Sequence, residues 1–227
     1  MGNKIDNLKI PIEEIKAIAE NGGVVIFFSP GGFGYVSPKN KTYAGSLLEG
    51  IKDTLKMWKY RVALINYSRA KNNIWGKIKS AKENLFSFHS ESKKLTGLIE
   101  TITTNFKNIK ILLIGYSSGA AFFNEVMKKI KGKDNIYCIQ AGTPFFYKRL
   151  TSENILFLDN NGKDALANGN IKKLTFIGII GILKLVLLFK LIRLKISEAF
   201  HFKEHEYFWE NPEIRLQVES FLKNNFL

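Results

Sequence analysis

Five residues, Gly115-Tyr116-Ser117-Ser118-Gly119, place a serine between two glycines in G-x-S-x-G spacing. The apolar, β-branched run at 109–114 predicts a buried strand, and 120–130 has the spacing of an amphipathic helix. A serine on a sharp turn between strand and helix is held in a strained conformation with its hydroxyl clear of the sheet edge. Side chains in place of the two glycines would clash there. The pattern therefore predicts nucleophilic chemistry at Ser117.

A nucleophilic serine needs partners of defined types. Its hydroxyl needs a neighbouring base, and a histidine base needs a carboxylate that fixes its tautomer. Acyl transfer also needs N–H donors for the developing oxyanion. The candidate bases are the chain's three histidines, His89, His201 and His205.

From Val24 to the C-terminal helix, the chain resembles the α/β-hydrolase family, in which oxyanion loop, serine, acid and histidine follow one another in this order. The resemblance implies a three-layer α/β fold with a mostly parallel central sheet and helices on both faces. It also implies a serine hydrolase with a Ser-His-Asp triad and no cofactor.

The resemblance favours His205 as the base, because residues 205–213 and the helix after them are similar to the family's histidine loop and last helix. His201, four residues earlier, is the alternative. His89 precedes the strand before Ser117 and fits the family order poorly.

For the acid, the resemblance favours Asp164, because the family's carboxylate usually lies a few residues past a strand end. Asp159 is the alternative, although it could still belong to the strand at 154–158. Beside Asn160, Asp159 also has the composition of a turn.

The expected oxyanion donors are the N–H groups of Ser118 and of the glycine-rich loop Gly31-Gly32-Phe33-Gly34. Gly32 is favoured, with Phe33 and Gly31 as alternatives, because small residues let backbone amides approach a substrate. The family's usual His-Gly start is replaced here by Ser29-Pro30.

Strands are predicted to alternate with helices along the chain, as in a parallel sheet covered on both faces. No repeat or low-complexity linker divides residues 1–227, so we expect one domain. The expected strands are 24–28, 61–67, 109–114, 135–139 and 154–158, and the expected helices are 11–20, 44–58, 91–106, 120–130 and 213–222.

The segment 172–195 is almost entirely apolar but has basic ends and Lys184 at its centre. A central lysine disfavours a membrane span, and a span would also separate acid from histidine. Two interpretations stay open: a lid or interfacial helix, or a buried helix followed by a last strand near 191–196. The first favours an acyl or lipid-like ester as substrate.

Two further functions are considered. The loop 140–144 is similar to a Gly-Thr-Pro loop of some lipases and palmitoyl-thioester hydrolases, and 115–126 also resembles acyl thioesterases, so thioester cleavage is the nearest alternative. A catalytically inactive, membrane-associated binding or scaffold protein is the alternative from another class.

The chain has 34 basic and 20 acidic residues and a net charge of +14. An anionic membrane surface is therefore a candidate partner, whereas no nucleic-acid motif is present. The single cysteine, Cys138, lies in an apolar run, which predicts that it belongs to the core. The histidines and the cysteine do not have the spacing of metal ligands. The N-terminus lacks a secretory pattern, so we expect a cytoplasmic protein, peripheral on a membrane if the basic surface binds one.

Overall fold

The computed structural model describes residues 12–19, 22–31, 43–69, 75, 83, 88–130, 134–172, 174–175 and 205–227. Its elements along the chain are α1 Ile12–Ala19, β1 Val24–Ser29, α2 Tyr43–Met57, β2 Val62–Asn66, α4 His89–Asn105, β3 Lys110–Tyr116, α5 Ser118–Lys129, β4 Ile136–Ala141, β5 Ile155–Leu158, α6 Ala165–Asn168 and α9 Pro212–Phe226.

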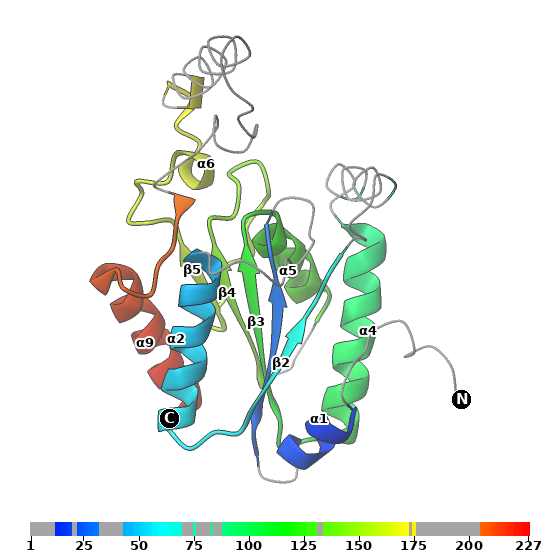
Figure 1. The fold of residues 1–227 in the computed structure, drawn as a ribbon. Helices are drawn as coiled ribbons and strands as arrows, with labels where there is room; N and C mark the ends of the chain where they lie inside the picture. The colour runs from blue at the N-terminus through cyan, green and yellow to red at the C-terminus, as the bar shows by residue number, and fades with distance from the viewer. Residues whose placement is uncertain are drawn as a thin grey trace.

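The strands form a five-stranded sheet in the order β2-β1-β3-β4-β5, in which every pairing is parallel. Helices cover both faces (Figure 1). One core cluster packs α1, α4 and α5 against the sheet, and the other packs α2 and α9 against the opposite face. The predicted three-layer α/β fold is confirmed. Cys138 is fully buried in the first cluster, as expected for a core residue.

The register aligns the carboxyl ends of the central strands. Ser29 of β1 lies opposite Gly115 of β3, and Tyr116 of β3 lies opposite Ala141 of β4. Ala141 in turn lies opposite Leu158, the last residue of β5. Since the strands point the same way (Figure 1), the segments that follow them all begin at one edge of the sheet. This edge gathers the loops that carry the candidate site.

The elements follow the predicted ones, except that the short helix α6 was not predicted and that α9 ends at Phe226 and not at 222. A further difference concerns the turn that carries Ser117. β3 continues through Tyr116 and α5 begins at Ser118, so Ser117 alone makes the turn between them. The extension is stabilised by pairing with β4, and the N–H of Ser117 donates to the carbonyl of Ala141 at 2.8 Å. From the sequence, the strand was expected to end at 114, because Gly115 interrupts the hydrophobic run. The pairing with β4 that extends the strand to Tyr116 leaves no signal in the local sequence.

The predicted lid or interfacial segment at 172–195 lies outside the described residues, except for 172, 174 and 175, as does the strand expected near 191–196. Across the described ranges, we find no helix with the length and hydropathy needed to cross a membrane.

Candidate active site

Ser117 lies on the turn between β3 and α5 in a backbone conformation that few residues adopt. Its φ is 51° and its ψ is −118°, outside the regions that L-residues favour. Such strain costs on the order of 1–3 kcal/mol and persists only where surrounding structure imposes it. The predicted strained turn is therefore confirmed.

The flanking glycines explain how so tight a turn can pack. A Cβ at Gly115 would lie 2.6 Å from Ala120 Cα, and a Cβ at Gly119 would lie 2.1 Å from the carbonyl oxygen of Ser29. Both distances are too short for any side chain, so the predicted clashes are confirmed. The second contact also shows that the start of α5 lies directly against the end of β1.

The loop after β1 reaches the serine. A Cβ at Gly31 would lie 3.0 Å from Ser117 Cβ and 3.7 Å from Ser117 Oγ. This places the start of the expected oxyanion loop beside the serine side chain. Gly32, the favoured donor, and Phe33 lie outside the described residues. Ser118, the other expected donor, is the first residue of α5.

A turn after β5 carries Asp164 away from the strand. Asn160, Asn161 and Gly162 all have positive φ, between 54° and 74°. Asparagine and glycine tolerate this left-handed conformation better than other residues. Asp159 belongs to the turn: its side chain accepts the N–H of Gly162 at 3.1 Å, the role that its neighbours suggested.

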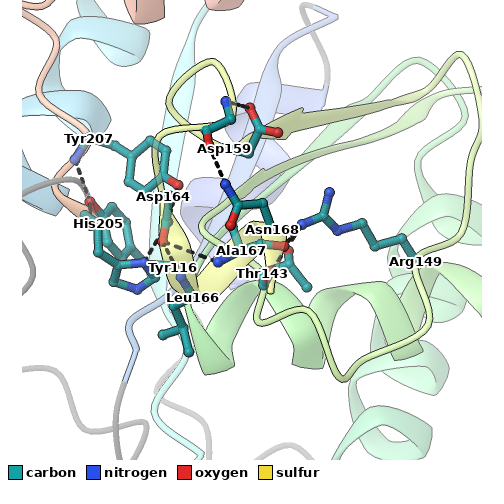
Figure 2. A network of polar contacts seen from close by, with 11 residues as sticks. Tyr116, Thr143, Arg149, Asp159, Asp164, Leu166, Ala167, Asn168, His205 and Tyr207 are labelled. Atoms are coloured by element: carbon teal, nitrogen blue, oxygen red, sulfur yellow. Dashed lines mark hydrogen bonds and ion pairs between the residues drawn. The ribbon is translucent and has the colours of Figure 1, made fainter. Parts of the chain in front are cut away.

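The two carboxylate oxygens of Asp164 have different partners. Oδ1 accepts the N–H groups of Leu166 and Ala167, at 2.9 and 3.1 Å, and so caps the short helix α6. Oδ2 is 2.7 Å from Nδ1 of His205 (Figure 2). The structure therefore brings together the favoured acid and the favoured base, which are 41 residues apart in the chain.

This pairing fixes the imidazole tautomer. An ionised carboxylate can only accept, so Nδ1 of His205 carries the proton and Nε2 remains an acceptor when the ring is neutral. Within the described residues, Nε2 is buried and has no hydrogen-bond partner. A buried acceptor without a partner is uncommon and costs free energy. An incoming hydroxyl proton would satisfy it.

Gly142 connects the imidazole of His205 to the serine turn. A Cβ at Gly142 would lie 2.5 Å from His205 Cε1, so the imidazole rests directly on this glycine. Gly142 has a positive φ of 64° and follows Ala141, whose carbonyl binds the N–H of Ser117. The described residues contain no hydrogen bond between Ser117 Oγ and His205 Nε2. Catalytic contacts often tighten only when substrate binds.

Two tyrosines hold the histidine loop. The fully buried Tyr207 donates its hydroxyl to Asp164 Oδ2 at 2.5 Å, so this oxygen serves both Tyr207 and His205. Tyr116, beside the serine, donates its hydroxyl to the carbonyl of His205 at 3.1 Å and accepts the N–H of Tyr207 at 2.6 Å (Figure 2). The strand that carries Ser117 therefore also fixes the backbone around His205.

These contacts keep Asp164 ionised. Burial raises the pKa of the Asp164 carboxyl, but the hydrogen bonds from His205, Tyr207 and the Ala167 amide outweigh it, and the pKa is lowered overall. Burial beside the Asp164 carboxylate raises the pKa of the Tyr207 hydroxyl, which therefore stays protonated and remains a donor.

The histidine loop is also attached to α2. The N–H of Trp209 donates to Ser46 Oγ at 3.0 Å, and Ser46 donates to Glu210 at 2.5 Å. Gly50 gives the indole room, since a Cβ there would lie 2.0 Å from the Trp209 ring.

The other predicted alternatives fall elsewhere. His89 is exposed at the start of α4, and His201 lies outside the described residues. Sequence reasoning missed Tyr116, Tyr207 and the buried Arg69. Tyr116 lies within the G-x-S-x-G motif and Tyr207 within the histidine loop. A tyrosine close to each predicted catalytic residue was therefore the feature of the sequence that could have pointed to these two contacts.

No group of three or more potential metal ligands occurs in the part of the chain that the structure describes.

Comparisons with known proteins found matches among solved structures. No protein-family model matches the chain. No curated protein matches it either. Among solved structures, the chain is similar to a Trichoderma reesei cutinase in complex with a C11Y4 phosphonate inhibitor, with 10% identity and a TM-score of 0.46 over 97% of this chain and 94% of the cutinase. A likeness at this level does not assign an activity to the chain.

Proposed function

We propose that this protein is a serine hydrolase that cleaves a carboxylic ester through Ser117, His205 and Asp164. The observation that carries the proposal is the pair of His205 with the buried Asp164, with Nδ1 and Oδ2 2.7 Å apart, at the sheet edge where Ser117 occupies its strained turn. A plain strand-to-helix connection needs neither the strain nor a histidine whose second nitrogen lacks a partner among the described residues.

The chemistry follows from the tautomer. Nε2 of His205 takes the proton of Ser117 as Oγ attacks the ester carbonyl, and Asp164 stabilises the imidazolium that forms. The N–H of Ser118 and a second N–H from the loop after β1, for which Gly32 is favoured, bind the oxyanion. Nε2 then gives its proton to the leaving alcohol, and an acyl group remains on Ser117. Water activated by the same histidine releases the acid and restores the serine.

Apolar surface beside the site supports an acyl or lipid-like substrate. Phe145 and Phe146, three and four residues after the Gly142 that supports His205, are 45% and 64% exposed. Phe145 contacts Gly169 at the end of α6, and Ile171 just beyond is 67% exposed. Large apolar side chains gathered in this way favour binding of an acyl chain.

A panel of p-nitrophenyl esters and acyl-CoAs of increasing chain length tests the proposal. The wild-type protein should hydrolyse esters, with a preference for apolar acyl groups, and Ser117→Ala should reduce turnover to background. Faster turnover of acyl-CoAs than of esters would favour the thioesterase alternative. A folded wild type that cleaves neither would overturn the proposal and favour an inactive binding protein.

A further inference from the structure

Arg69 is a buried cation that the proposed triad does not use. It follows β2 at the carboxyl edge of the sheet and is only 5% exposed. Its guanidinium lies over the rings of Phe88 and Phe122, at 5.0 and 5.6 Å from their centroids. A buried guanidinium is costly unless it is paired or hydrogen-bonded, so its position calls for specific partners.

One nitrogen of Arg69 contacts both segments from which oxyanion donors are expected. Nη2 donates to the carbonyl of Pro30, the residue before Gly31, at 3.1 Å. The same Nη2 donates to the side chain of Ser118 at 2.9 Å. Arg69 therefore connects the loop after β1 to the first residue of α5.

The spacing between these segments matters for catalysis. An oxyanion hole works only when its donors are held at fixed distances from the developing charge, and a small displacement weakens the stabilisation. The backbone of the two segments is already in contact, since a Cβ at Gly119 would meet the carbonyl oxygens of Ser29 and Pro30. The hydrogen bonds from Arg69 to Pro30 and Ser118 further hold the two segments together.

The charge of Arg69 has the right sign. Burial lowers the pKa of its guanidinium to about 10, so it stays protonated at neutral pH. The carboxylates of Glu91 and Glu83 favour the charged form of Arg69 and offset part of its charge. The remaining positive charge, at the Ser118 side chain, adds to the positive potential of the N-terminus of α5. Both favour negative charge on an oxygen bound at the Ser118 amide.

We infer that Arg69 is a positioning residue for the oxyanion hole. Its hydrogen bonds to Pro30 and Ser118 keep the two donor segments at a fixed distance from each other. The inference rests on the proposed serine-hydrolase function. Its competitor is a purely structural role, in which Arg69 only fills space between aromatic rings.

The test is the rate at which a fluorophosphonate probe modifies Ser117, separated into maximal rate and half-saturating concentration. Arg69→Met should lower the maximal rate of labelling about 10- to 100-fold, which is at most the effect of losing a direct oxyanion donor. The half-saturating probe concentration should change less than about threefold, because binding of the probe does not depend on the oxyanion. Lys110→Met is the matched control, because Lys110 also lies over aromatic rings and donates to a carbonyl, but at the opposite end of β3. It should lose stability and keep its rate.

A double-mutant cycle with Ser118→Ala identifies the route. This variant keeps the Ser118 amide and removes only the hydroxyl that Arg69 binds. It should slow labelling, and adding Arg69→Met should then cost clearly less than it costs in the wild type. Full additivity would contradict action through Ser118.

The outcomes separate the two proposals. A folded wild type that the probe does not label overturns the serine-hydrolase proposal, and the inference falls with it. A labelled wild type with an Arg69→Met variant that reacts at the same rate overturns the inference alone. If Arg69→Met does not fold, Arg69→Lys and Ser118→Ala decide: wild-type maximal rates in both would contradict the inference.

Discussion

At the scale of single residues, Asp164 combines a structural and a chemical task. Oδ1 caps α6, while Oδ2 receives hydrogen bonds from His205 and Tyr207. An asparagine could still cap the helix through its oxygen. Its NH₂ group would then face two donors in place of an acceptor.

Asp164→Asn is therefore expected to fold but to lose activity. The amide would favour the wrong imidazole tautomer, and kcat should fall by about 10⁴-fold, as in serine triads that lose the carboxylate. Steady-state hydrolysis of a p-nitrophenyl ester checks the value. Asp159→Asn is the control, because an amide oxygen can still accept from Gly162, and it should keep nearly full activity. Equal losses in both variants would contradict the assignment of Asp164.

The same carboxylate should make stability depend on pH. Because the pKa of Asp164 is lowered in the folded state, its contribution is present above the unfolded value of about 3.9 and is lost as the pH falls through the lower folded value. Urea unfolding of the wild type and Asp164→Asn should show a larger difference in free energy of unfolding at about pH 5 than at about pH 3. The difference should shrink below about pH 4. A difference that stays unchanged down to pH 3 would contradict a lowered pKa.

At the scale of elements, the turn between β3 and α5 stores backbone strain at the proposed nucleophile. The surrounding contacts impose it, since Gly115 and Gly119 leave no room and the Ser117 amide is bound to Ala141. These contacts hold Ser117 in its strained conformation, and the strain lowers the stability of the folded protein.

Replacing Ser117 with glycine or alanine should measure that cost. Both variants lose the hydroxyl, but only glycine adopts this φ readily, so Ser117→Gly should be about 1 kcal/mol more stable than Ser117→Ala. Lys93 in α4 is exposed and helical, and there the order should reverse, with alanine more stable than glycine. Urea denaturation of the four variants checks both. Alanine more stable than glycine at position 117 would mean that the turn is unstrained.

Sequence alone predicted the elements well, because hydrophobic runs and turn residues are local signals. Each of the five described strands lies within a residue or two of its expected range. Chain order and the resemblance also identified Asp164 and His205, which the structure brings together. The contacts of Tyr207, Tyr116 and Arg69 could not be predicted, because they join residues that are 43, 89 and 49 positions apart and depend on strand register and side-chain direction.

At the scale of the whole molecule, the net charge of +14 remains without an assigned partner. If it serves to bind an anionic membrane, the protein should float with vesicles that contain phosphatidylserine and not with phosphatidylcholine vesicles. Raising the salt from 0.1 to about 1 M shortens the screening length from about 10 to about 3 Å and should release it. Equal recovery with both kinds of vesicle would contradict an electrostatic interaction.

The central claim is that Ser117 is a nucleophile activated by the Asp164–His205 pair. The most direct measurement is mass-spectrometric mapping of the adduct formed with a fluorophosphonate probe. We expect one stoichiometric adduct on Ser117 in the wild type, none in Ser117→Ala and much slower labelling in His205→Ala. A folded wild type that stays unmodified, or an adduct on another residue, would contradict the claim.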